Sequence, residues 1–96
     1  MAATRDILII GGGHNGLVTA AYLAKAGMKP LVLESRLALG GAARTEELAP
    51  GFRCPTLAHA AGPFEPQIIA DLGLARPGVD WLTPAVRAFA PAPNGG

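Results

Sequence analysis

A run of glycines between two apolar segments constrains the fold of this chain more than any other sequence feature. The run, residues 11–13, ends the apolar stretch 6–10 and precedes residues 14–26, whose composition favours a helix. Residues 6–10 are apolar on both faces, which is typical of a buried parallel strand. Gly27 stands where a helix commonly ends in a left-handed residue. These patterns predict a strand that turns directly into a helix.

A second strand is expected over residues 30–34, with Pro30 at its first position, where no ladder donor is lost. Two parallel strands joined by a helix form a right-handed βαβ crossover. The predicted fold class is therefore α/β, a Rossmann-like βαβ unit. Only two parallel strands are recognisable, so we expect an incomplete doubly wound sheet.

The glycine spacing assigns this turn a function. In Gly11-x-Gly13-x-x-Gly16, the first glycine permits the turn, the second lets a pyrophosphate approach the backbone, and the third lets helix and strand pack closely. The first helical turn then presents unpaired N–H groups to the diphosphate. Glu34 follows Gly16 by eighteen residues and ends the second strand, where a carboxylate accepts ribose hydroxyls and repels a 2′-phosphate. The alternatives are an ordinary strand-to-helix turn and a solvated carboxylate.

The stretch after the second strand resembles the double-glycine motif of the flavin-dependent family of phytoene desaturases and amine oxidases. That motif runs acid, one residue, Arg, three residues, Gly-Gly-Arg, two residues, then Ser or Thr. The matching positions are Glu34, Arg36, Gly40, Gly41 and Thr45. The arginine after the glycine pair is replaced by Ala42, which leaves open whether Arg44 makes the same phosphate contact.

The resemblance implies that the cofactor is FAD and that the chain begins a longer oxidoreductase. The phytoene-desaturase-like branch is indicated by the residues that follow the glycine run and by residues 71–74 and 77–79. The expected organisation is one FAD-binding domain over residues 1–96, with a βαβ unit at 5–34, the double-glycine motif at 34–45 and a loop-rich remainder at 46–96. The cofactor-binding residues expected are Gly11, Gly13, His14, Asn15, Gly16, Glu34, Ser35, Arg36, Gly40, Gly41, Ala42 and Thr45.

Two other functions stay open at this point. One is an NAD-binding dehydrogenase fragment, although the Gly40-Gly41 pair has no role in ordinary NAD domains. The other is a freestanding dinucleotide-binding module without catalysis. No catalytic residue is identified, because His59 has no acid or nucleophile at a useful spacing. The substrate is an unknown small molecule, and whether this chain alone is an enzyme stays undecided.

Charge and composition exclude several classes of function. Eight Lys and Arg residues nearly balance seven Asp and Glu residues, and they are scattered, so nucleic acid is not an expected partner. No apolar run is long enough to span a membrane, and no metal-ligand spacing occurs. Cys54 is the single cysteine, which fits a reducing compartment, and the cytoplasm is expected.

Two further elements are expected after the motif. Residues 67–72 predict a short helix ended by Gly73, and residues 79–82 predict a brief strand. Half of the residues are apolar, and two parallel strands leave an edge and an apolar face uncovered. We therefore expect the chain to form a homo-oligomer.

Overall fold

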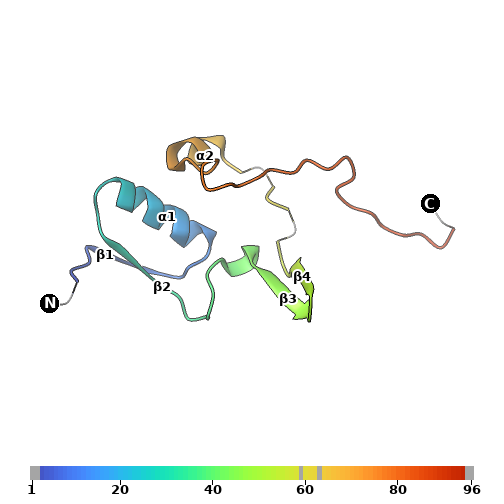
Figure 1. Ribbon diagram of the computed structural model, residues 1–96, viewed down its shortest axis with the longest axis horizontal. Helices are drawn as coiled ribbons and strands as arrows, with labels where there is room; N and C mark the ends of the chain where they lie inside the picture. Colours follow the sequence, from blue (N-terminus) through green and yellow to red (C-terminus); the bar gives the residue numbers. More distant parts are fainter. Residues whose placement is uncertain (1–2, 59, 63, 95–96) are drawn as a thin grey trace.

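The computed structural model describes residues 3–58, 60–62 and 64–94. Strand β1, Ile7–Ile10, lies parallel to strand β2, Pro30–Leu33, and helix α1, His14–Lys25, connects them (Figure 1). Ile7 pairs with Pro30 and Ile10 with Leu33. The predicted Rossmann-like βαβ unit is therefore confirmed, with its strands and helix each within about one residue of the expected ends.

Glycine conformations form both connections of this unit. Gly11 has φ +105° and turns the chain out of β1, and Gly27 has φ +87° directly after α1. Both values lie in the left-handed region, which glycine adopts without steric cost. The hydrogen bond from the Lys29 N–H to the Asp6 carboxylate, at 2.8 Å, then holds the start of β2 beside the start of β1.

Close packing of α1 on the strands depends on Gly16. A Cβ built at this position would lie 2.2 Å from the backbone oxygen of Gly11 and 3.4 Å from Cγ2 of Ile9. No side chain fits at that distance from a carbonyl oxygen. The glycine therefore sets how near the helix approaches the turn that follows β1, as the motif predicts.

An antiparallel hairpin follows the double-glycine motif, at the start of the part of the chain expected to be rich in loops. The 3₁₀ turn η1, Gly41–Ala43, leads into strand β3, Thr45–Ala49, which pairs with strand β4, Phe52–Pro55. Pro50 stands in the turn between the two strands and Pro55 is the last residue of β4, positions at which a hairpin tolerates proline. Gly51, with φ +83°, occupies the turn between them.

Helix α2, Pro66–Leu72, is the short helix predicted near this position, and Gly73 ends it with φ +61°. Asp71 of α2 makes the hydrogen bonds that connect this helix to α1. The Asp71 carboxylate accepts hydrogen bonds from the Tyr22 hydroxyl and the Gln67 amide, both at 2.7 Å, and its backbone oxygen accepts one from Lys25. Tyr22 and Lys25 belong to α1, so Asp71 is the polar link between the two helices.

The strand predicted over residues 79–82 does not form. Residues 79–94 have no helix or strand and run away from the helices in Figure 1. The Trp81 ring instead packs against Phe64, with ring centroids 5.3 Å apart. A strand needs a neighbour to pair with, and within the described residues β1 and β2 pair only with each other.

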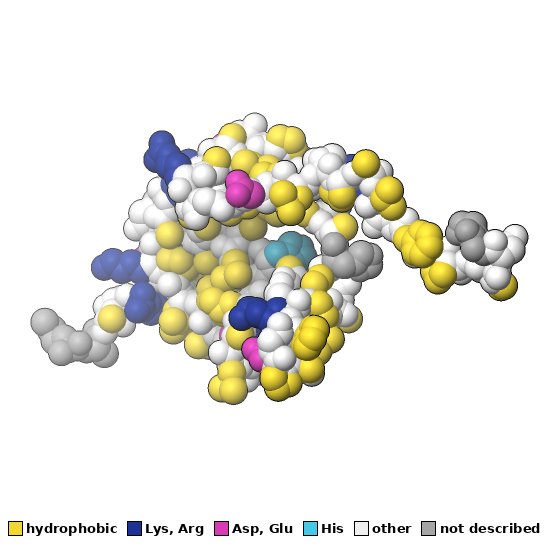
Figure 2. All heavy atoms as spheres, turned by 45° about the vertical axis from the view of Figure 1, so that its right-hand side comes forward, with side chains coloured by type: hydrophobic (Ala, Val, Ile, Leu, Met, Phe, Trp, Pro, Cys, Tyr) yellow, Lys and Arg dark blue, Asp and Glu magenta, His cyan; other side chains and the backbone are white. Residues whose placement is uncertain are grey.

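Hydrophobic side chains cover much of the surface instead of forming a closed core. None of those described is fully buried, and Figure 2 shows them spread over the molecular face in view. The radius of gyration is 17.7 Å, whereas about 12–13 Å is usual for a compact chain of this length. The expectation that β1 is buried is wrong for this structure, because α1 covers only the face that carries Ile7 and Ile9. Leu8 and Ile10 on the other face are 61% and 89% exposed.

None of the helices in the described part of the chain is long and apolar enough to span a bilayer.

Candidate dinucleotide site

The glycine run and the double-glycine motif lie against each other in the structure. The Gly40 N–H donates to the backbone oxygen of Gly12 at 2.8 Å, and Gly13 and Gly40 form a short parallel bridge. A Cβ built on Gly41 would lie 3.1 Å from the Cα of Gly13. Two motifs more than twenty residues apart in sequence therefore form one backbone surface at the N-terminal end of α1.

Glu34 is attached to this surface through hydrogen bonds to its carboxylate. One carboxylate oxygen accepts the N–H of Gly12 at 2.8 Å, and the other accepts the N–H of Arg36 at 3.1 Å. The hydrogen bond from Gly12, followed by that from Arg36, lowers the pKa of the Glu34 carboxyl below its ordinary value, against a smaller opposing effect of burial. A carboxylate has about four acceptor positions, so these hydrogen bonds leave acceptor capacity for a ligand hydroxyl.

The first turn of α1 is open to a ligand. Gly13 precedes the helix in an extended conformation, and no side chain within the described ranges caps the N–H groups of the turn. Leu17 donates the first N–H to the oxygen of Gly13, which leaves the N–H groups before it without helical partners. His14 and Asn15 are exposed within this turn.

Gly13 has room around it that the packing of the chain does not use. The nearest atom to a Cβ built there is the Cα of Gly41, at 3.9 Å, an ordinary contact distance. Gly13 has no positive φ either, so neither backbone conformation nor internal packing explains this glycine. The space beside Gly13 is what the motif requires at the position where a pyrophosphate approaches the backbone.

For the remaining predicted residues, the described part of the chain shows no side-chain contact that defines a role. Ser35 and the Arg36 side chain are exposed. The backbone oxygen of Ala42 accepts the N–H of Ala58 at 3.1 Å, and exposed Thr45 begins β3. His59 lies outside the described residues.

Arg44, the open candidate for a phosphate contact, forms an ion pair with Glu46. Its guanidinium lies 3.0 Å from the Glu46 carboxylate, and its side chain is 21% exposed. Its aliphatic stem also lies over Gly40, where a Cβ would be 2.8 Å from Cγ of Arg44. A phosphate contact by Arg44 would therefore compete with the ion pair to Glu46.

Two residues at this site were not found by the motif. Gly12 is the one buried position among residues 3–58, 60–62 and 64–94, and it contacts both Glu34 and Gly40 through its backbone. Leu39 lies over Gly12, because a Cβ built on Gly12 would be 2.4 Å from Cδ2 of Leu39. The triple glycine of the sequence gave a signal for Gly12, whereas nothing in the pattern distinguished Leu39 from Leu37.

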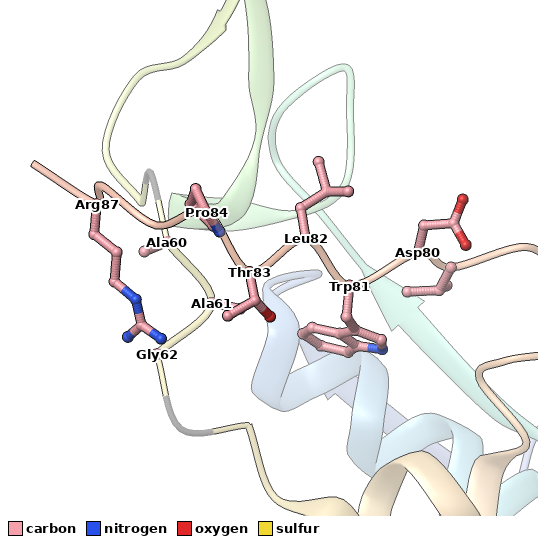
Figure 3. A pocket seen from close by; sticks show the side chains of 10 residues that line it. Ala60, Ala61, Gly62, Asp80, Trp81, Leu82, Thr83, Pro84 and Arg87 are labelled. Atoms are coloured by element: carbon pink, nitrogen blue, oxygen red, sulfur yellow. The ribbon is translucent and has the colours of Figure 1, made fainter.

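Hollows of similar size also lie beside this backbone surface and elsewhere on the molecule, and two of them differ in whether the predicted site residues reach them. One, of about 500 Å³, adjoins the first turn of α1 and is lined by His14 and Asn15 together with residues near α2. The other, of about 590 Å³, lies between residues 60–62 and 79–87 (Figure 3). Trp81, Leu82 and Arg87 line the second hollow, and none of the predicted site residues reaches it.

Residues 9–72 match the family model described as the NAD(P)-binding Rossmann-like domain. The chain belongs to this family. The match includes the glycine run, Glu34, the double-glycine motif, the hairpin and α2, and it ends where α2 ends. The surface formed by the two glycine motifs is therefore part of a dinucleotide-binding domain.

Curated relatives extend the similarity to longer proteins. The mouse pyridine nucleotide-disulfide oxidoreductase domain-containing protein 2 is 46% identical over 74 residues, which are 77% of this chain and 13% of that protein. A limonene dehydrogenase polypeptide of Castellaniella defragrans is 45% identical over 89 residues, 86% of this chain and 15% of that protein. The thiamine thiazole synthase of Archaeoglobus fulgidus is 51% identical over 39 residues, 41% of this chain and 15% of that protein.

The chain thus spans between 13% and 15% of the length of these relatives. No solved structure gives a significant match. The family description and the relatives support a dinucleotide cofactor without deciding between FAD and NAD(P).

Proposed function

We propose that this chain binds the ADP moiety of FAD as the N-terminal domain, residues 1–96, of a phytoene-desaturase-like oxidoreductase. The observation that carries the proposal is the contact of Gly40 and Gly41 with the glycine run at Gly12 and Gly13. The double-glycine motif distinguishes the flavin family from ordinary NAD domains. Its contact with the phosphate-binding turn supports a role for it in the same nucleotide site.

The residues of the surface fit an adenine dinucleotide. The open space at Gly13 and the uncapped N–H groups of α1 suit a diphosphate, whose charge the helix dipole favours. Glu34 keeps acceptor capacity for a ribose hydroxyl, and its negative charge disfavours a 2′-phosphate. In this proposal Ser35, Arg36 and Thr45 line the route of the cofactor, while Ala42 contributes only backbone.

Bound FAD supplies the redox chemistry by accepting a hydride equivalent as a carbon–carbon or carbon–nitrogen bond is desaturated. The described residues bind and orient the nucleotide. Residues that select the substrate belong to the larger part of the relatives that this chain does not span. The name of the limonene dehydrogenase relative is compatible with such a reaction class.

The competing cofactor is NAD, because the family description names NAD(P). Purified protein is incubated with FAD or with NADH and passed over a gel-filtration column. The absorbance retained with the protein is then measured at roughly 450 nm for flavin and about 340 nm for NADH. Retention of FAD but not of the nicotinamide supports the proposal. Retention of NADH alone would replace it by a nicotinamide-dependent function.

A further inference from the structure

Leu39 lies at the centre of the contact between Glu34 and the glycine run. A Cβ built on Gly12 would be 2.4 Å from Cδ2 of Leu39 and 3.1 Å from the Glu34 carboxylate oxygen that accepts the Gly12 N–H. The leucine methyl and the carboxylate therefore occupy the same side of Gly12. Gly12 itself is buried, so the hydrogen bond between its N–H and Glu34 is partly shielded from water.

The backbone fixes the position of Leu39. Its neighbour Gly40 donates its N–H to the Gly12 oxygen at 2.8 Å and has φ +117°. This anchor holds the segment between β2 and η1 (Figure 1) against the glycine run, one residue after Leu39. Leu37, two residues earlier, is fully exposed, whereas Leu39 is 54% exposed. Two leucines of one segment thus have different environments, and Leu37 is a matched control.

An apolar side chain over a backbone-to-carboxylate hydrogen bond strengthens it by excluding competing water. We infer that Leu39 is a positioning residue of the dinucleotide site, which acts through Glu34 by holding its carboxylate on the Gly12 N–H. The remaining carboxylate lone pairs are then oriented before the ribose arrives. Preorganisation of this kind increases affinity because no ordering cost is incurred on binding. The inference rests on the proposed function, in which Glu34 binds ribose.

The test compares Leu39→Ala with Leu37→Ala in the full chain, each alone and combined with Glu34→Ala. Two quantities are measured: the dissociation constant for FAD, from flavin fluorescence, and the hydrogen-exchange rate of the Gly12 amide without ligand, from NMR. Leu39→Ala is expected to raise the FAD dissociation constant about 3- to 10-fold and to speed exchange at Gly12. Leu37→Ala is expected to change neither. In the Glu34→Ala background, Leu39→Ala is expected to have no further effect on FAD affinity.

Equal effects of Leu39→Ala and Leu37→Ala would overturn the inference. So would an undiminished effect of Leu39→Ala on affinity in the Glu34→Ala background, because Leu39 would then contact the ligand directly. If Leu39→Ala loses its helical circular dichroism, Leu39→Met and Leu39→Asn replace it, and only the apolar variant is expected to behave as wild type. Failure of the unmodified chain to bind FAD would refute the proposed function, and this inference with it, before any variant is compared.

Discussion

The Glu34 carboxylate, directly after β2, accepts a 2.8 Å hydrogen bond from the N–H of Gly12, two residues after β1. This bond joins the acid and the glycine turn into one unit before any nucleotide is present. Substitutions in that unit and in the packing around it should therefore have distinct effects on binding and on folding.

Two substitutions of Glu34 distinguish the contribution of its charge to FAD binding from that of its shape. Glu34→Ala removes the acceptor for ribose and for the Gly12 N–H, and should weaken FAD binding roughly 10- to 100-fold, the scale of a hydrogen bond to a charged group. Glu34→Gln keeps one acceptor oxygen and should lose less affinity. Isothermal titration calorimetry measures both. Unchanged affinity in Glu34→Ala would mean that Glu34 does not bind ribose.

Gly13→Val should abolish FAD binding and leave the fold intact, because a Cβ at this position would meet no atom outside the adjacent residues closer than the Cα of Gly41, at 3.9 Å. Circular dichroism should show an unchanged helix content, while fluorescence shows no bound flavin. Gly16→Ala is the contrasting variant, since its Cβ would meet the Gly11 oxygen at 2.2 Å. It should lower the stability of the fold itself by about 1–3 kcal/mol. Retained FAD binding by Gly13→Val would contradict the role assigned to the turn.

The attachment of α2 to α1 should weaken in acid. Hydrogen bonds from Tyr22 and then Gln67 lower the pKa of the Asp71 carboxyl below its ordinary value of 3.8. A lowered pKa contributes stability above pH 3.8 that is lost as the pH falls through the lowered value. Asp71→Asn should therefore release α2 from α1 at neutral pH. The stability of this variant should also vary less than that of the unmodified chain as the pH falls below 3.8.

Amide hydrogen exchange over residues 66–72 measures this release, with Asp80→Asn in the irregular segment as the control. Faster exchange in Asp71→Asn but not in Asp80→Asn is expected. If exchange in α2 is the same in both variants, packing and not Asp71 holds the helices together.

The uncovered face of the β1–β2 sheet should make the isolated chain self-associate. Leu8 and Ile10 are 61% and 89% exposed on one face, and contiguous apolar patches favour association. Analytical ultracentrifugation at micromolar concentration should show a dimer or larger species. The interface expected in such a species buries at least roughly 1,000 Å². Leu8→Lys with Ile10→Lys should shift the population to monomer. A monomeric unmodified chain at these concentrations would contradict the expectation.

The βαβ unit could be predicted because its signals are local. The apolar strand, the glycine turn and the acid each depend on neighbours within a few residues, and the spacing alone places Glu34 at the end of β2. The hairpin of β3 and β4 is not predicted by the sequence pattern, because proline is a loop signal, although Pro50-Gly51 is also a turn signal between two strands.

Contacts between distant residues could not be predicted in the same way. Tyr22 and Asp71 are 49 positions apart, and neither stands in a motif that indicates a partner. Leu39 and Leu37 are chemically identical, and only the anchoring of Gly40 on Gly12 gives them different environments. The count of parallel strands predicts an uncovered sheet face. The residue pattern of β1, which is typical of a buried strand, does not predict that Leu8 and Ile10 are exposed.

The contrast between Gly16 and Gly13 has a consequence for how such a sequence would change under mutation. Gly16 is required by a carbonyl oxygen of the chain itself, so selection for folding alone would preserve it. A Cβ at Gly13 would meet only the Cα of Gly41, at an ordinary 3.9 Å, so under the proposed function the ligand is what requires a glycine here. A descendant of this chain that no longer needed its cofactor could therefore replace Gly13 first, whereas Gly16 would still be required for folding.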